Sequence, residues 1–161
     1  MAGMSDGPPL HPALEPLEFL LGTWKGKGAG SYPDIADFDY LEVVSFSHVG
    51  KPFLSYVQGT RDASTGQPLH AETGYLRPVG DDRAELLIAQ PSGIMELLDV
   101  ELSGSSFRAT STTVVQAPTA KQVDAVLRIV TVTRNEMHYE LHMAAMGHPL
   151  LPHLEAVLIR D

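Results

Sequence analysis

The sequence contains no cysteine among its 161 residues. This absence excludes disulfide bridges, thiolate zinc sites and iron–sulfur clusters, so any metal must be held by histidine, by carboxylates or within a cofactor. Basic residues are also scarce, because 11 Lys plus Arg face 20 Asp plus Glu and the formal net charge is -9. No Lys/Arg cluster forms a phosphate-binding surface. Nucleic acid and anionic membranes are therefore not expected as partners.

Long apolar runs are missing as well. No run reaches the roughly 18 residues of a membrane span, and the N-terminus has neither the basic nor the apolar segment of a secretory signal. We therefore expect a cytoplasmic protein without a membrane partner. Hydrophobic residues nevertheless make up 43% of the chain. They are spread from Leu14 to Ile159, which indicates a globular fold with a sizeable core.

The chain divides into a short leader and one domain. Residues 1–11 are rich in Gly, Pro, Ser and Asp and are expected to be disordered. Residues 12–161 are about the length of a single domain. The domain opens with a predicted short helix that lies mostly after Pro16 and stops at Gly22, because proline suits the first turn of a helix and glycine its end.

From Thr23 onward, short β-rich runs alternate with turn residues at the spacing of an all-β protein. We predict strands at 23–31, 38–48, 53–60, 69–77, 84–90, 94–101, 107–115, 123–133, 137–145 and 153–160. Short connections favour antiparallel neighbours. The predicted fold is an all-β, ten-stranded antiparallel up-and-down β-barrel with a short N-terminal helix, although the pattern alone also allows a two-sheet sandwich.

Seven histidines are the available soft-metal ligands. His138 and His142 have the spacing of a helical zinc motif, but they lie in an alternating strand that would separate them by roughly 13 Å. His48 ends a predicted strand and His148 falls in a turn, and both positions are typical of surface polar residues. His153 follows a Pro-Leu-Leu-Pro stretch and enters the most apolar strand, so it is either a satisfied core histidine or a ligand at the mouth of a hydrophobic interior.

Several motifs together resemble the nitrobindin family of haem-binding β-barrels. The first is the Gly-x-Trp-x-Gly-x-Gly pattern at residues 22–28, followed by Gly-Ser-Tyr-Pro at 30–33. Further matches occur in the family's order at residues 46–52, 68–75, 88–93 and 149–156. The resemblance covers nearly all of residues 12–161 and implies a fold related to fatty-acid-binding proteins and lipocalins.

The resemblance also implies a cofactor and its ligand. The histidine of the final family motif, here His153, is expected to be the proximal ligand of one non-covalent haem b per chain. His70 falls on the expected pocket wall. Asp34 replaces the family's usual Thr, and the family's pocket Lys corresponds to Lys121 or its neighbour Gln122, so Asp34, Lys121 and His70 are candidate haem contacts.

The first motif has a separate, structural interpretation. Trp24 is the only tryptophan. It is predicted to close the base of the barrel, while Gly26 and Gly28 would let strand and helix approach closely. We assign Gly22, Trp24, Gly26 and Gly28 to folding.

The function that the resemblance implies is isomerisation of peroxynitrite to nitrate at ferric haem, together with nitric oxide binding, in a monomer or homodimer. The main alternative is a non-enzymatic carrier of haem or of a small apolar ligand. Fatty-acid carriers clamp a carboxylate with Arg-x-Tyr, and the sequence Arg128-Ile129-Val130 lacks the tyrosine.

Overall fold

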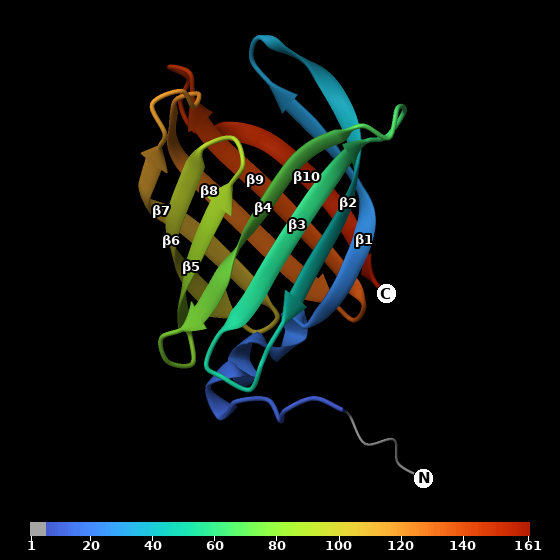
Figure 1. Cartoon of the computed structure of the whole chain (residues 1–161), viewed down its shortest axis with the longest axis vertical. Helices are drawn as coiled ribbons and strands as arrows, with labels where there is room; N and C mark the ends of the chain where they lie inside the picture. Colours follow the sequence, from blue (N-terminus) through green and yellow to red (C-terminus); the bar gives the residue numbers. More distant parts are fainter. Residues whose placement is uncertain (1–5) are drawn as a thin grey trace.

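The computed structural model describes residues 6–161, which fold as a closed β-barrel with a short helix at one end (Figure 1). The strands are β1 (Gly22–Tyr32), β2 (Ile35–Ser47), β3 (Leu54–Asp62), β4 (Pro68–Pro78), β5 (Arg83–Gln90), β6 (Ile94–Ser103), β7 (Ser106–Gln116), β8 (Val123–Thr133), β9 (Glu136–Ala145) and β10 (Leu151–Arg160). Each strand pairs antiparallel with the next along the chain. The predicted ten-stranded barrel is confirmed, and the sandwich is excluded.

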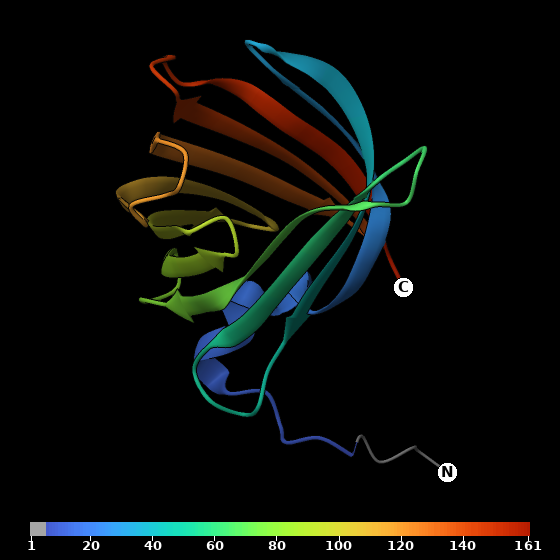
Figure 2. The same ribbon diagram turned by 45° about the horizontal axis from the view of Figure 1, so that its top comes forward.

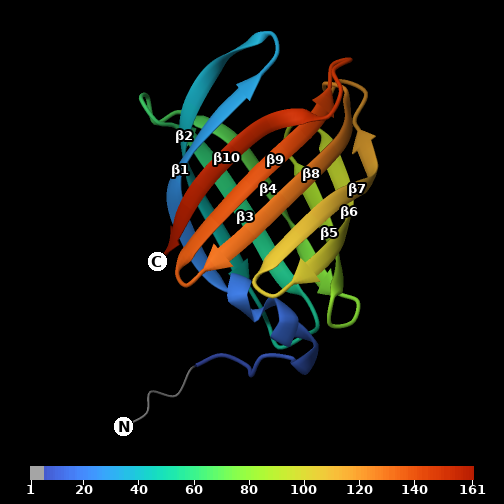
Figure 3. The same ribbon diagram turned by 180° about the vertical axis from the view of Figure 1, so that it is seen from behind.

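Pairing of the first strand with the last closes the barrel. β1 pairs with β2 on one side and with β10 on the other, in a register that places Gly30 opposite Leu154 (Figure 3). Because every strand in residues 6–161 is then paired on both sides, this part of the chain has no open sheet edge. The same pairing brings the end of β1 beside the start of β10, more than a hundred residues later in the chain.

The helix, η1 (Pro12–Leu20), is a 3-10 helix and begins earlier than the sequence predicted. Leu14, Leu17 and Leu20 follow each other at intervals of three residues and are fully buried, as the three-residue turn of a 3-10 helix requires. The His11 side chain accepts a hydrogen bond from the Ala13 backbone N–H and caps the helix. The apolar face of η1 therefore plugs one end of the barrel.

Disorder of residues 1–11 stays a prediction. Residues 1–5 lie outside the described part of the chain, and Leu10 packs against the core. Within residues 6–161, no helix is long and apolar enough to cross a membrane.

Trp24 joins the helix to the barrel. Its indole is fully buried, and its Nε1–H donates a hydrogen bond of 2.9 Å to the Leu20 carbonyl. The Arg160 guanidinium lies over the indole ring at 4.4 Å from the centroid and donates to the carbonyls of Leu21 and Phe19. The end of β10 is thereby fixed to the end of η1.

Gly26 and Gly28 allow close approaches, but the partner is not the helix as the sequence suggested. A Cβ at Gly26 would lie 2.0 Å from the Val157 carbonyl oxygen on β10. A Cβ at Gly28 would lie 2.2 Å from the Tyr40 ring on β2. The two glycines thus give room to the closing strand and to a buried ring.

Gly26→Ala is therefore expected to lower the free energy of unfolding by about 1–3 kcal/mol, because the new methyl group would meet backbone atoms that cannot rotate away. Gly59→Ala on β3 is the matched control, since no atom lies within 4 Å of the Cβ it would add. Urea unfolding of both variants checks this. Equal stability of the two variants would contradict the close approach of β1 and β10.

Candidate functional site

The barrel encloses a cavity of about 880 Å³ on the side away from η1. Its walls are inward-facing side chains of the strands, most of them apolar. Its mouth is formed by the hairpins β1–β2, β7–β8 and β9–β10, which Figure 2 shows gathered at the end opposite η1. The cavity is therefore a pocket with one closed end and one open end.

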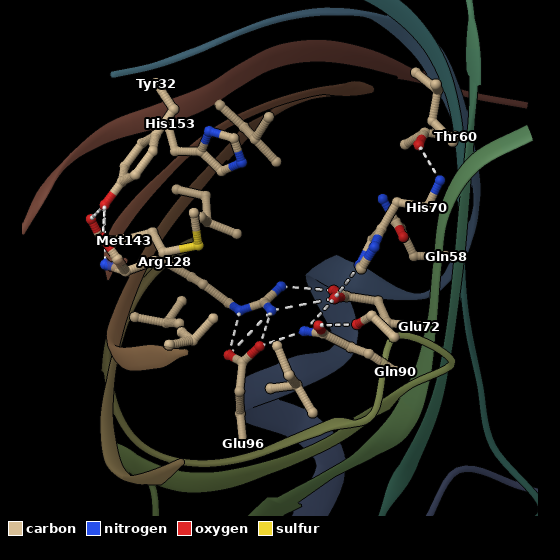
Figure 4. Close-up of a pocket in the computed structure, with 18 of the residues that line it drawn as sticks. Tyr32, Gln58, Thr60, His70, Glu72, Gln90, Glu96, Arg128, Met143 and His153 are labelled. Atoms are coloured by element: carbon tan, nitrogen blue, oxygen red, sulfur yellow. Dashed lines mark hydrogen bonds and ion pairs between the residues drawn. The ribbon is translucent and has the colours of Figure 1, made fainter. Parts of the chain in front are cut away.

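His153 on β10 projects into this cavity from one wall (Figure 4). Its Nδ1 lies 3.0 Å from the Ser31 carbonyl oxygen on β1. A carbonyl oxygen only accepts hydrogen bonds, so Nδ1 carries the proton and Nε2 keeps its lone pair. Burial lowers the pKa of His153, partly offset by the Ser31 hydrogen bond. The ring is thus held neutral, with Nε2 available to a metal.

Two aromatic side chains fix the plane of this imidazole. The Tyr32 and Phe38 rings meet it edge-on, with centroids 5.2 and 6.4 Å away. Tyr32 is itself anchored, because its hydroxyl donates to the Met143 carbonyl and accepts from the Ala145 N–H. The position of His153 is therefore determined by three strands.

The other residues singled out in the sequence divide into two groups. Asp34, Lys121, Gln122 and His70 all line the cavity. The Asp34 carboxylate lies 3.0 Å from Nε2 of His148, which the sequence placed in a turn and which also lines the mouth.

His138 and His142 lie on β9 outside the cavity lining, each next to its own glutamate. The Gly-x-Trp-x-Gly-x-Gly motif (residues 22–28) begins at the η1 end of β1, away from the mouth.

A buried polar cluster that the sequence did not predict lies across the cavity from His153 (Figure 4). Arg128 on β8 bridges Glu72 and Glu96 at 2.6 and 2.8 Å. His70 and Gln90 bond to the same carboxylates. Burial acts to raise the pKa of Glu72, but the Arg128 charge and the hydrogen bonds from His70 and Arg128 hold it well below its usual range.

A second buried group lies around Glu42 on β2. Tyr139 on β9 donates its hydroxyl to Glu42 Oε2, and Gln58 donates its amide to Glu42 Oε1 at 3.1 Å. The Tyr139 and Tyr40 oxygens are 2.6 Å apart. Burial raises the pKa of Glu42 to about 7, against the opposing effect of these hydrogen bonds. This carboxyl therefore titrates near neutral pH.

The sequence contained a signal for this second group. Tyr40, Glu42, Val44 and Phe46 share the alternation of β2, so a charged residue falls among positions that face the interior. Tyr139 likewise occupies an inward position of β9. An acidic residue at such a position marks a buried polar site.

The geometry can be compared with known proteins. The family described as THAP4-like, heme-binding beta-barrel domain matches residues 13–160. The chain is 50% identical over 156 residues to "Peroxynitrite isomerase 1" of Mycolicibacterium paratuberculosis (strain ATCC BAA-968 / K-10), covering 94% of this chain and 97% of the relative. It is also 50% identical over 156 residues to "Peroxynitrite isomerase 2" of Mycobacterium avium (strain 104), with the same coverage.

Solved structures agree with the fold. The crystal structure of Rv2717c from M. tuberculosis superposes with a TM-score of 0.89 at 46% identity, covering 95% of this chain and 99% of that one. The S-type phycobiliprotein lyase CPES from Guillardia theta has a TM-score of 0.64 at 8% identity and covers 89% of each chain, which shows the barrel fold alone. The resemblance drawn from the motifs is confirmed.

Replacing Glu42 by Gln should stabilise the protein at alkaline pH. The folded-state pKa of about 7 lies above the ordinary 4.5, so the free energy of unfolding falls as pH rises from about 4.5 to about 7. Glu42→Gln removes this loss, of the order of 3 kcal/mol above pH 7. Below pH 4.5 the two proteins should be equally stable.

Thermal unfolding across this pH range measures the difference, with Glu140→Gln on the outer surface as the control. A stability difference between wild type and Glu42→Gln that stays constant with pH would contradict the assignment.

Proposed function

This chain belongs to the THAP4-like, haem-binding β-barrel family, and we propose that it holds one non-covalent haem b through Nε2 of His153. The observation that carries the proposal is the hydrogen bond from His153 Nδ1 to the Ser31 carbonyl. Histidines that bind metals usually donate their other N–H to such a partner, which fixes both the tautomer and the ring orientation.

The residues around His153 fit a haem in other respects. Apolar side chains form most of the cavity wall, so burying the porphyrin would contribute about 25 cal/mol per Å² of apolar surface. Lys121 at the mouth offers a cation for a propionate, and His70 lines the opposite wall, with its Nε2 bonded to Glu72. Asp34 acts indirectly, because its carboxylate holds His148.

We infer further that the loaded protein isomerises peroxynitrite to nitrate and binds nitric oxide, the first of these being the activity for which its relatives are named. Haem bound here would supply an iron that acts as a Lewis acid toward a small anion or diatomic ligand. The chain's part is to orient that iron through His153. η1 closes the far end of the barrel, so a ligand enters from the mouth.

The alternative of a fatty-acid carrier is weakened by Arg128. This is the cation deep in the cavity that would have to clamp a carboxylate, and both Glu72 and Glu96 already occupy its guanidinium. An additional carboxylate would face two buried negative charges. A non-catalytic haem carrier remains the alternative, and kinetics separates it from the enzyme.

Hemin titration tests the ligand. His153→Ala should lose the shifted Soret band, with an apparent dissociation constant at least about tenfold higher, equivalent to about 1.4 kcal/mol. His142→Ala on the outer side of β9 is the matched control and should bind as wild type. Unchanged hemin binding in His153→Ala would refute the assignment.

Stopped-flow mixing with peroxynitrite tests the activity. The hemin-loaded protein should accelerate decay toward nitrate relative to the apoprotein and to His153→Ala. The net charge of -9 repels an anion, so the rate should rise modestly with ionic strength as the charge is screened. Equal rates for all three proteins would leave a haem carrier without isomerase activity.

A further inference from the structure

Tyr40, Tyr139 and Glu42 form a hydrogen-bonded chain with a defined direction. When Glu42 is ionised, its carboxylate can only accept hydrogen bonds, so the single hydroxyl proton of Tyr139 lies toward Glu42. The hydroxyl of Tyr40 must then be the donor in the 2.6 Å bond between the two phenol oxygens. The Tyr139 oxygen thus donates to a base and receives a hydrogen bond from a second phenol.

We propose that Tyr139 is a redox-active tyrosine, which gives up one electron to an oxidant in the cavity while its phenol proton moves to Glu42. The Tyr139 O–H bond breaks, a new O–H bond forms on the carboxylate, and the oxidant gains the electron. The product is a neutral tyrosyl radical whose oxygen still accepts the Tyr40 hydrogen bond.

The environment favours this coupled step over simple electron loss. A tyrosine that kept its proton would become a cation in an apolar interior, at high electrostatic cost. Prior loss of the proton to solvent is also unfavourable, because burial raises the pKa of Tyr139 far above its ordinary value. A proton acceptor already hydrogen-bonded to the phenol avoids both charged forms.

Glu42 is suited to receive the proton. Within residues 6–161 no Lys, Arg or His lies within ion-pair distance of it, and its partners Tyr139 and Gln58 are neutral. Its charge is therefore buried without a directly paired cation, which is costly, and Arg128, which pairs with Glu72 and Glu96, acts on it only from a longer distance. Electron loss from Tyr139 with proton transfer to Glu42 takes this site from one negative charge to none.

A second buried tyrosine provides an internal comparison. Tyr56 donates to Glu72 at 2.6 Å, so its geometry resembles that of Tyr139. Glu72, however, also accepts hydrogen bonds from Arg128, and its negative charge is stabilised by that ion pair. A proton on Glu72 would disrupt this pair. Tyr56 should therefore be much harder to oxidise than Tyr139.

Tyr40, Tyr139 and Glu42, the redox unit, lie close to the proposed haem ligand. A role for haem as the oxidant rests on the proposed function. The Phe38 ring contacts both the His153 ring and the Tyr40 ring, with centroid separations of 6.4 and 6.0 Å. All three proposed members of the unit line the same cavity as His153. Bound haem would supply the oxidant by reducing hydrogen peroxide to two molecules of water, a two-electron reaction for which Tyr139 would provide one electron and the haem the other.

The first experiment uses the apoprotein and does not depend on haem. Pulse radiolysis generates azide radicals, which take one electron from the protein and become azide. The oxidised protein is frozen and examined by electron paramagnetic resonance. The tyrosyl signal should narrow when the protein contains ring-deuterated tyrosine. It should be largely lost in Tyr139→Phe and in Glu42→Gln, and retained in Tyr56→Phe.

The second experiment adds hydrogen peroxide to the hemin-loaded protein and compares the same variants, after the Soret band has shown that each binds hemin. The same pattern of loss supports the proposal. Retention of the signal in Tyr139→Phe, or equal loss in Tyr56→Phe, overturns it in either experiment. If hemin fails to bind but the apoprotein gives the expected pattern, the haem assignment fails and the redox-active tyrosine stands.

Discussion

Closure of the barrel by β1 and β10 is the constraint on which the rest of the structure depends. The pairing requires glycine at residue 26, where the β10 backbone leaves no room for a side chain. It also places the Ser31 carbonyl within hydrogen-bond distance of His153. One backbone register therefore shapes the pocket and orients the residue that we propose binds iron.

The interior has two unlike walls. On the His153 side, aromatic rings and apolar strand residues surround a neutral imidazole. On the other side, Glu72 and Glu96 both pair with Arg128. Glu42 on β2 belongs to neither wall and is buried with only neutral hydrogen-bond partners. Removing Arg128 would leave two buried carboxylates without their cation, which typically costs several kcal/mol. The Glu42 group can instead change its protonation state near neutral pH.

Much of the fold could be predicted from the sequence because period-two alternation and turn residues are local signals. The alternation that set His138 and His142 apart from a helical zinc motif is the alternation of β9 in the structure, which turns Met137 inward and His138 outward. The start of the helix was missed because Pro16 suggests a first turn, whereas the 3-10 geometry tolerates it and is set by burial of Leu14, Leu17 and Leu20. The roles of Gly26 and Gly28 were also misjudged, since a close approach between strands far apart in sequence has no local signal.

The candidate site was predictable only in part. His153 stood out through its neighbours and through the family resemblance, and its local context alone did not separate ligand from core histidine. The Arg128 cluster joins β4, β6 and β8, so its members meet only after the barrel closes. Contacts between residues so far apart in the sequence cannot be predicted from the spacing of motifs.

The central claim is that His153 holds the haem iron. Resonance Raman spectroscopy of the ferrous, hemin-loaded protein tests it most directly, through the iron–histidine stretching band and its shift with nitrogen-15 histidine. If His153 is the ligand, the band disappears in His153→Gly, and added imidazole restores an iron–imidazole band without the isotope shift. A band in His153→Gly that persists without imidazole and still shifts with labelled histidine would contradict it.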